Sequence, residues 1–549
     1  MAVDWTSALD RARAHAPFLA RALERRPELA ELLAQGDGEV ALRAAKRVKE
    51  GSAASALRDE RLGLALVLAI GDLAGAFDLD KVMRELSTFA DRALDRALNT
   101  AMNSRVPDAE PSGMIGLALG KHGAGELNYS SDIDPILLYD PEKLPRRERD
   151  EPGEAAQRYA REVVRLLSDV TSEGYVFRVD LRLRPASEVS PLAIPLNAAI
   201  THYESSALAW ERAAFIRARA CAGDIAAGEE FLDHIRPFVW RRSLDFGAID
   251  EVRRLTHRIR DQHSGPSVPE PGYNLKLGRG GIREIEFFAQ THQLIHGGRD
   301  PSLRSRGTRA ALDALAATGR IGEEDARALG ESYDGLRTIE HRLQMVGDKQ
   351  THSLPAGDAL DNVAQLHGLA DGSALVKHVQ ELARPVAERF DALLDEDRIS
   401  VPASAPHVLA GDTAEGDVPA ELVDRIAGWT DGKYQALRST AALGAFEAIR
   451  PDLIASISGS PDPDAAVVRW EGLISRLPSA INLFRLLEAR PGLFALLADC
   501  LTLAPPLADE LARRPNLLDA LIDRTALDLP GSVDDIVARM GRRERGDDY

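Results

Sequence analysis

Cysteine is almost absent from this chain, whose 549 residues include only Cys221 and Cys500. Two cysteines exclude the disulfide framework of a small secreted protein and any zinc site built from cysteine ligands. The first residues contain acids and lack the apolar core of a secretion signal. We therefore expect a protein of the reducing cytoplasm.

Long apolar runs are absent too. The longest covers residues 62–71, and ten residues are too few to cross a bilayer as a helix. No membrane partner is expected.

Aromatic residues and positive charge are both in short supply. Aromatics make up 5% of the chain, so its cores must rely on Leu, Ala, Val and Ile, a composition that favours helices. Lys and Arg number 68 against 86 Asp and Glu, which gives a net charge of −18. Because nucleic-acid binding needs a surplus of cations, we expect no nucleic-acid partner. A local basic pocket remains compatible with this composition.

The pattern of apolar residues changes twice along the chain. Apolar positions recur at three- and four-residue spacing up to about residue 105 and again from about 195 onward, which predicts helices. Three short segments between them predict strands, at Met114 to Gly120, Ile133 to Tyr139 and Val176 to Arg184. An amphipathic helix is expected over about 157–171. The fold class is therefore α+β and mostly helical, with a small sheet domain embedded among helices.

The length suggests several domains. The expected parts are a helical region over 1–105, a sheet domain over 106–195, a helical domain over 196–398, a Pro- and Gly-containing linker over 399–416 and a helical segment over 417–549.

One stretch of sequence is echoed near the end of the chain. Residues 19–34 align with residues 507–522 at an offset of 488, with eight of sixteen positions identical. Chance similarity between two Ala- and Leu-rich helices explains this as well as a duplication does. A duplication would put a second Asp-x-Asp near position 620, in a longer parent of which this chain is a fragment.

The segment GKHGAGELNYSSDID, residues 120–134, carries the densest chemistry. Its spacing fits neither a P-loop nor a dinucleotide fingerprint. Two residues apart at the head of a strand, Asp132 and Asp134 would project from one face, close enough to share divalent cations. Two such ions would clamp the attacking and leaving oxygens of a phosphoryl or nucleotidyl transfer. The competing interpretation is a solvated strand end.

A carboxylate pair of this kind needs a third acid, and Asp180 is the obvious one. It lies on the polar side of the alternating segment Val176 to Arg184, together with Arg178, Arg182 and Arg184. These arginines could neutralise phosphate oxygens. A solvated sheet face explains them equally well.

Three further groups are weaker candidates. His292 and His296 have the spacing of a helical zinc pair, but no third ligand is evident, so we expect a packed or solvent-facing pair. Residues 276–286 form a Gly-rich turn before a helix whose polar face, with Arg283 and Glu286, either lies outside the site or lines it. For residues 339–344 we expect a charged helix face, with His352 as an unproven addition.

Four motifs together resemble those of the glutamine synthetase adenylyltransferase/adenylyl-removing enzyme family. They are GKHGAGELNYSSDID, VFRVDLRLRP, NLKLGRGGIREIEFFAQ and IEHRLQMVGDKQTHSLP, in order between about 114 and 355. Departures occur at Ala124, where glycine is common, and at Pro135, where Leu is usual. Residues 477–523 resemble the helical region that joins the two halves of this family.

The resemblance implies a nucleotidyltransferase domain of the polymerase β type. Members carry two, an N-terminal one that removes AMP from a tyrosine of glutamine synthetase by phosphorolysis and a C-terminal one that attaches AMP from ATP. A single Asp-x-Asp set in this context indicates the N-terminal, adenylyl-removing half. By motif, metal would be bound by Asp132, Asp134 and Asp180, phosphate by Gly120, Lys121, Ser130 and Ser131, and charge would be neutralised by Arg182 and Arg184.

The implied cofactor is Mg²⁺, as two ions, with Mn²⁺ as the alternative metal. The implied partners are adenylylated glutamine synthetase, the PII signalling protein, orthophosphate and ADP or ATP. Two other functions stay open from the sequence: an ATP-dependent adenylyltransferase acting on glutamine synthetase or another protein, and a regulatory binding module without catalysis. The three intact acids weigh against the second.

Overall fold

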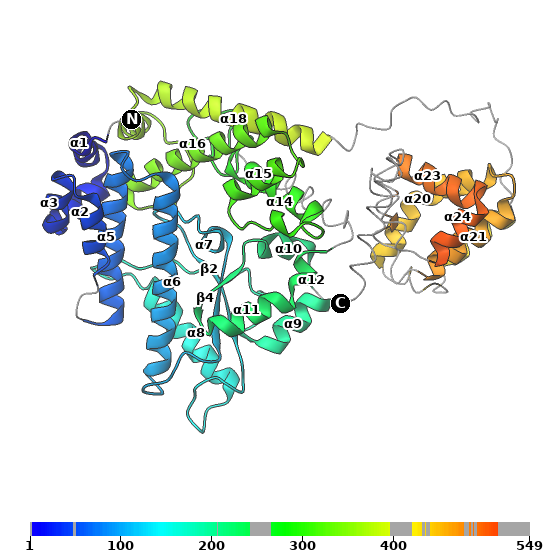
Figure 1. Ribbon diagram of the computed structural model, residues 1–549, viewed down its shortest axis with the longest axis horizontal. Coiled ribbons are helices and arrows are strands. Elements are labelled where there is room, and N and C mark those ends of the chain that lie inside the picture. Colours follow the sequence, from blue (N-terminus) through cyan, green and yellow to red (C-terminus); the bar gives the residue numbers. More distant parts are fainter. Residues whose placement is uncertain are drawn as a thin grey trace, which may run out of the picture. The chain divides into compact units, whose positions relative to one another are not determined.

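The computed structural model describes residues 3–47, 51–205, 207–241, 265–395 and 420–513, the last range with gaps at 431–433, 435–436, 438–439, 477–482, 485–486 and 488–490 (Figure 1). The described residues fall into two compact units, one up to 394 and one over 420–513. The chain is mostly helical with one small sheet, which confirms the expected α+β class. The expected linker at 399–416 lies outside the described residues, and the domain boundaries proposed from the sequence stay predictions.

Six helices precede the sheet, as the apolar spacing predicts. They are α1 (Trp5–His15), α2 (Pro17–Arg25), α3 (Pro27–Ala34), α4 (Gly38–Ala45), α5 (Ala53–Leu73) and α6 (Leu79–Asn103). The longest, α6, starts at Asp78, whose carboxylate caps the helix by accepting a hydrogen bond from the Lys81 N–H. Its buried residues recur every three or four positions, so one face of α6 packs into the core.

Four strands form one mixed sheet. The elements of this region are β1 (Met114–Leu119), α7 (Gly120–Ala124), β2 (Asp134–Tyr139), α8 (Pro152–Ser168), β3 (Ala193–Pro195), α9 (Leu196–Ser205), α10 (Ala209–Phe215), β4 (Arg219–Gly223), α11 (Ile225–His234) and α12 (Arg236–Val239). The strand order is β3-β2-β1-β4, with β2 and β4 antiparallel to β1 and β3 parallel to β2. The last strand, β4, comes from a segment that the sequence analysis assigns to the following helical domain.

Both faces of this sheet are covered by helices, which explains why β1 reads as a continuous apolar run. Met114 and Ala118 of β1 belong to the core shared with α6 and α8. Ile115, Leu117 and Leu119 belong to the core on the other face, which includes residues of α9, α11 and α12 (Figure 1). The end of β1 is thereby fixed in space, and the Gly-rich turn follows directly from it.

Two of the three expected strands are present. β1 and β2 match the predicted segments, and Pro135 fits in β2 opposite Ala118, because β3 joins β2 only from Leu137 onward. The third prediction, a strand over 176–184, is wrong. Only Val179 pairs, in a single parallel bridge with Ile133, and the chain then turns. The alternation of apolar and polar residues there reflects which side chains face the site rather than a continuous ladder.

The remaining helices of the first unit are α14 (Ile282–His296), α15 (Thr308–Ala317), α16 (Glu323–Gly347), α17 (Asp358–His367) and α18 (Gly372–Asp395), with a short 3-10 helix η1 (Pro301–Leu303). They share a core in which Tyr333, Leu336, Ile339 and Leu343 of α16 are buried. Helix α16 contacts α2, α6, α14, α15 and α17, so it holds the helices of this unit together.

The second unit has its own core around Trp429, Phe446 and Trp470. Its described elements are α19 (Ala420–Ala427), η2 (Gly428–Thr430), α20 (Thr440–Ser458), α21 (Pro463–Arg476), α23 (Pro491–Leu503) and α24 (Pro505–Arg513). The echo in the sequence has a structural counterpart here. Helices α2 and α24 start 488 residues apart, and α1 and α23 end at the same offset. Residues 514–522 of the second copy lie outside the described residues.

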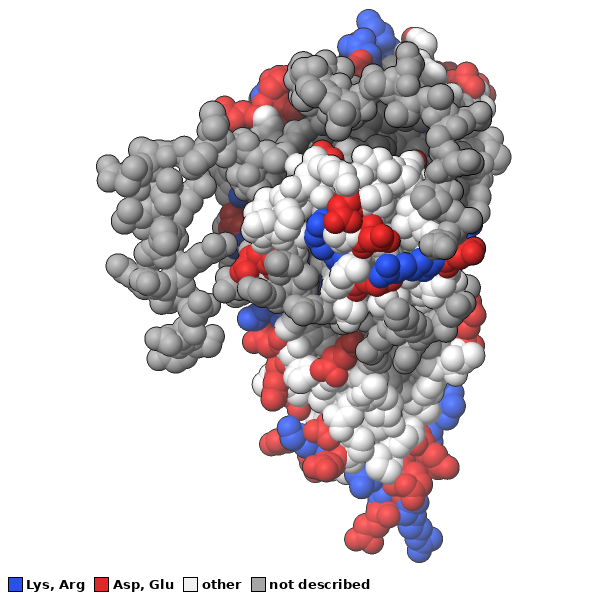
Figure 2. All heavy atoms as spheres, turned by 90° about the vertical axis from the view of Figure 1, so that its right-hand side faces the viewer, with Lys and Arg blue, Asp and Glu red and all other residues white. Residues whose placement is uncertain are grey.

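No helix among the described residues is both long and apolar enough to cross a bilayer. On the face drawn in Figure 2, acidic and basic side chains are interspersed with large uncharged areas.

Candidate functional site

The three predicted acids meet at the start of β2. Residue Ile133 pairs with the segment around Val179: its N–H donates to the carbonyl of Arg178 (3.0 Å), and its carbonyl accepts from the N–H of Asp180 (2.9 Å). This bridge brings Asp180 beside the strand start that carries Asp132 and Asp134. The single bridge between Ile133 and Val179 thus places Asp180 near Asp132 and Asp134, a role that the sequence analysis assigns to a third strand.

Asp134 is the buried member of the group. Its Oδ2 lies where a Cβ on Gly120 would be, at 2.5 Å, and Gly120 has a φ of +56°, so only glycine fits opposite this carboxylate. Burial, and then the negative charges of Asp180 and Asp132, raise the pKa of Asp134 to about 7. A cation bound nearby would stabilise the charged form of this carboxyl group.

The outer two acids each have an arginine partner. Asp132 accepts from Arg178 Nε at 2.5 Å and from Gln350 Nε2 at 3.0 Å. Asp180 accepts from Arg182 Nε at 2.9 Å and from the Arg182 backbone N–H. Each outer carboxylate is therefore paired with an arginine. Among the described residues, the ligand oxygens of the three acids do not all lie within 4.8 Å of one another.

The donor set nevertheless suits a hard divalent cation. Three carboxylates supply the oxygen ligands that Mg²⁺ prefers, and burial together with the neighbouring acids raises the pKa of Asp134 despite the charges of Lys276 and Arg182. A cation bound here would offset the mutual repulsion of the acids. The chemistry of Asp132, Asp134 and Asp180 therefore fits a metal site, and their role as metal ligands stays a prediction.

The Gly-rich turn after β1 is the short helix α7. A Cβ on Gly123 would lie 2.2 Å from the carbonyl oxygen of Arg217 and 2.6 Å from that of Ala118, so backbone packs where a side chain would be. The departure at Ala124 falls on a residue that is only half-buried. Tight packing under α7 fixes Gly120 against Asp134.

Lys121 points toward α16. Its ammonium lies 3.1 Å from both carboxylate oxygens of Glu340, which is fully buried and also accepts from His352 Nδ1 at 2.6 Å. Burial lowers the pKa of Lys121 to about 8, although Glu340 opposes the shift. Its role as a phosphate ligand stays a prediction.

The two serines are held by backbone and side-chain contacts. Ser130 is buried, and its N–H donates to Gln344 Oε1 at 2.9 Å, while its hydroxyl lies 3.4 Å from the Tyr175 hydroxyl. Ser131 Oγ accepts from the Asn128 N–H at 3.4 Å. Both follow the loop into Asp132, so their phosphate role stays a prediction as well.

The predicted arginines differ in setting. Arg182 is 86% exposed and reaches only Asp180 among the acids. Arg184 donates to the carbonyls of Leu181, Ser187, Ser190 and Pro191, so it ties together the loop that follows Asp180. That geometry makes Arg184 a residue that holds the loop.

Arg283 and Glu286 lie on the same buried stretch of α14. Glu286 accepts from Arg217 Nη1 at 3.0 Å. Burial alone would raise the pKa of Glu286, but the charges of Arg217, Arg283 and Lys121 lower it to about 2. The polar face of α14 is therefore inside the protein, beside the cations of the site.

Sequence reasoning did not single out several residues that belong to this site. Lys276 carries a charge that reaches Asp134, Gln350 binds Asp132, and Glu340 binds Lys121. Lys276 lies in the motif NLKLGRGGIREIEFFAQ, and Glu340 and Gln350 lie in the motif IEHRLQMVGDKQTHSLP. The expectation of a charged, solvated face at 339–344 is wrong, because Glu340 and its neighbours are buried and paired.

Two other clusters contain residue types that can bind metal. The rings of His292 and His296 stack 6.2 Å apart, and His292 packs against Phe288, which confirms a packed pair. Asp91, His122 and Cys221 have ligand atoms within 4.8 Å of one another. However, Asp91 is already held by His122 Nε2 (2.8 Å) and by both terminal nitrogens of Arg219.

The chain matches known protein families along most of its length. The family model for glutamate-ammonia ligase adenylyltransferase matches residues 6–234, and the model for the GlnD PII-uridylyltransferase matches residues 251–394. Their joint extent covers every residue of the site.

Curated relatives agree with the first of these models. Bifunctional glutamine synthetase adenylyltransferase/adenylyl-removing enzymes are 41% identical in Caulobacter vibrioides, over 85% of this chain and 50% of the relative. The same name belongs to relatives from Xanthobacter autotrophicus (41%, over 95% of this chain and 55% of the relative) and Agrobacterium fabrum (38%, over 90% and 52%).

A small mixed sheet, a Gly-rich turn and three converging acids define a nucleotidyltransferase-like domain. The matches make the class specific. Along most of its length the chain is similar to bifunctional glutamine synthetase adenylyltransferase/adenylyl-removing enzymes. It spans about half the length of the curated relatives it matches.

Proposed function

We propose that this chain removes AMP from an adenylylated tyrosine of glutamine synthetase by Mg²⁺-dependent phosphorolysis, releasing ADP. The observation that carries the proposal is the meeting of Asp180 with Asp132 and Asp134 through the Ile133–Val179 bridge. Three acids on two adjacent segments are the ligand set that nucleotidyl transfer requires.

The metal would be held by Asp132, Asp134 and Asp180. When bound, it supplies Lewis-acid stabilisation of the charge on the reacting phosphoryl group and on the leaving oxygen. Asp134 packs against Gly120, whereas Asp132 pairs with Arg178 and Asp180 with Arg182, so these two acids would have to give up part of their arginine contacts to hold a metal.

The chain's cations would receive the incoming orthophosphate. Arg182 is exposed and tethered only to Asp180, so it can turn toward a phosphate oxygen, and the charge of Lys276 already reaches Asp134. An oxygen of orthophosphate forms the new bond to the adenylyl phosphorus while the bond from phosphorus to the tyrosine oxygen breaks. The products are ADP and a tyrosine phenolate, which takes up a proton, since the phenol has a pKa of about 10.

The direction of reaction rests on the resemblance of the motif order. One Asp-x-Asp set follows six helices and precedes α14 and α16, the order of the adenylyl-removing half. The names of the relatives cover both removal and attachment of the adenylyl group, so they support the substrate more strongly than the direction.

The alternative is ATP-dependent attachment of AMP to glutamine synthetase or another protein. It uses the same three acids, since the chemistry is the same displacement at phosphorus with a different nucleophile. The two directions therefore have to be separated by their nucleotide products.

The PII signalling protein is proposed as a regulatory partner. Residues 251–394, which include α14 and α16, match the GlnD PII-uridylyltransferase model. Since α16 contributes Glu340 and Gln344 to the site, a partner bound to these helices could act on Lys121 and Ser130.

The proposal is tested by incubating the chain in two reactions. One contains adenylylated glutamine synthetase, orthophosphate and Mg²⁺, and the other contains unmodified glutamine synthetase, ATP and Mg²⁺. We expect ADP from the first and no adenylylation in the second. The reverse pattern would establish the alternative, and inactivity in both with an otherwise folded chain would contradict nucleotidyl transfer on glutamine synthetase.

A further inference from the structure

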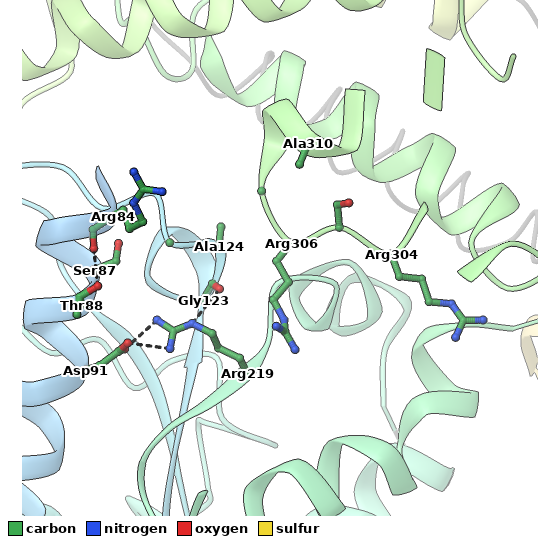
Figure 3. A pocket seen from close by; sticks show the side chains of 13 residues that line it. Arg84, Ser87, Thr88, Asp91, Gly123, Ala124, Arg219, Arg304, Arg306 and Ala310 are labelled. Carbon is green, nitrogen blue, oxygen red and sulfur yellow. Dashed lines mark hydrogen bonds and ion pairs between the residues drawn. The ribbon is translucent and has the colours of Figure 1, made fainter. Parts of the chain in front are cut away.

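A cavity of the first unit is lined by none of the three acids. It has a volume of about 550 Å³, within the range of small-molecule pockets. Its walls come from α6, from the turn at the end of α7, from β4 and from the loop before α15 (Figure 3). None of the residues proposed for catalysis lines it.

The lining is strongly basic for so acidic a chain. Among the described residues that line the cavity are four arginines, Arg84, Arg219, Arg304 and Arg306, and one acid, Asp91. The charge of Asp91 is already matched, because it binds Arg219 at 2.8 and 2.9 Å and His122 at 2.8 Å. The pocket therefore holds excess positive charge.

Two of the arginines are suited to bind a ligand. Arg306 is exposed and donates its Nε to the carbonyl of Ala218 at 3.0 Å, and no ion pair with another described residue engages its terminal nitrogens. Arg84 pairs with Asp80, but both side chains are more than half exposed, so that pair is weak. Figure 3 shows Arg84 and Arg306 on opposite sides of the turn at Gly123 and Ala124, with Arg304 directed away from them.

The directions of approach favour phosphate over carboxylate. Arg84 comes from α6, Arg219 from β4 and Arg306 from the loop before α15, so the guanidinium groups reach the cavity from three elements. A tetrahedral phosphate offers oxygens in several directions, whereas a carboxylate offers two in one plane. Gly125 at the edge of the turn leaves open space where a side chain would be, which lets a ligand approach the backbone.

We propose that this pocket binds a phosphate-bearing small molecule at a site separate from the three catalytic acids. The site adjoins α7, whose first residue packs against Asp134 and whose last residues line the pocket. Its occupant would thus contact the same short helix as the catalytic centre.

The test is calorimetric titration of the full chain with inorganic phosphate in EDTA at constant ionic strength. Without divalent metal, the three acids repel phosphate, so saturable binding reports on the arginine pocket. We expect binding to weaken at least tenfold in a variant combining Arg84→Gln and Arg306→Gln. Arg43→Gln on α4, an exposed arginine outside the pocket, and Asp134→Asn should bind as the unchanged chain does.

Three results would overturn the proposal. They are the absence of saturable binding, equal affinity in the Arg84 and Arg306 double variant, and equally strong competition by succinate, which would indicate a carboxylate site. Circular dichroism of each variant shows whether it is folded. A chain with Arg306→Lys, which keeps the charge, should bind phosphate more tightly than one with Arg306→Gln.

Discussion

Asp134 is held where its charge is least stable, against Gly120 and beside two other acids. Proteins keep such groups in place when a ligand compensates for them, which is why buried acids with a raised pKa mark functional sites. We predict that Asp132→Asn or Asp134→Asn abolishes turnover, while the midpoint of thermal unfolding stays the same or rises, because repulsion is relieved. Asp140→Asn, just after β2, is the matched control. Near-normal turnover of either variant at saturating Mg²⁺ would remove this site from consideration.

Arg184 acts on the site through the loop it holds. Its guanidinium binds four carbonyls between residues 181 and 191, so Arg184→Ala leaves these groups unpaired. We expect a loss of about 2 kcal/mol of local stability, the usual worth of hydrogen bonds from a charged group. Hydrogen exchange of residues 181–191 should accelerate, and turnover should fall together with it. Unchanged exchange with an increased phosphate requirement would mean instead that Arg184 contacts phosphate.

Two half-buried histidines, His292 and His367, should make the fold sensitive to acid. Burial, together with the neighbouring charge of His296, lowers the pKa of His292 to about 4, and burial, with Arg342 and His378, lowers that of His367 to about 4. An unfolded histidine binds its proton near pH 6.5. Between these values the unfolded chain binds more protons, so the free energy of unfolding falls as the pH falls.

We expect a loss of about 2 kcal/mol for each of these histidines between pH 6.5 and 4.5. The variant His292→Phe should lose about half of the combined dependence, whereas His234→Phe, at the surface, should keep it. Denaturant unfolding at several pH values measures this. An unchanged slope in His292→Phe would show that this histidine does not titrate as its burial predicts.

At the level of elements, helix α16 links the catalytic turn to the rest of the unit. Glu340 is fully buried and neutralises Lys121 and Arg337 while accepting from His352. Its replacement by Gln would leave buried cations unmatched, which costs about 3–5 kcal/mol. We predict that Glu340→Gln lowers the free energy of unfolding by that order, and that Glu331→Gln on the exposed face of α16 changes it by less than about 0.5 kcal/mol. Similar stabilities of the two variants would contradict a structural role for this ion pair.

The strands and helices that the sequence predicts well are those with a simple burial pattern. The run Met114–Leu119 is apolar because both sheet faces are covered, and α6 shows regular spacing because one face is buried. Residues 176–184 also alternate, but only Val179 forms a bridge, with Ile133, and the polar side chains bind nearby acids and loop carbonyls, so alternation here does not mean a strand. Helix α16 reads as charged because its partners, such as Asp72 and Lys121, lie far away in the sequence.

The same limit applies to the site. The motifs predict Asp132, Asp134 and Asp180, because a strand start and a polar segment can be recognised from the local sequence. Lys276 and Gln350 could not, because only the packing of two later loops brings them to the acids. Arg184 was assigned a direct role because sequence gives the residue type and not the direction of its guanidinium.

The whole chain spans about half the length of the curated relatives it matches, and its described residues carry one cluster of three acids at the start of β2. Helix α24 starts 488 residues after α2, and α23 ends 488 residues after α1, which is the offset of the sequence echo. The burial is not identical, since Leu19 is buried and Leu507 is 57% exposed. A repeated helix pair would begin a second copy of the unit that carries the site.

Orthophosphate is the proposed nucleophile at this site. The most direct measurement supplies [³²P]orthophosphate and unlabelled adenylylated glutamine synthetase, with Mg²⁺, and follows the label. We predict ADP labelled in its β-phosphate, in amounts equal to the adenylyl groups lost, and none with Asp134→Asn. Unlabelled AMP as the product would mean that water attacks, and it would contradict phosphorolysis.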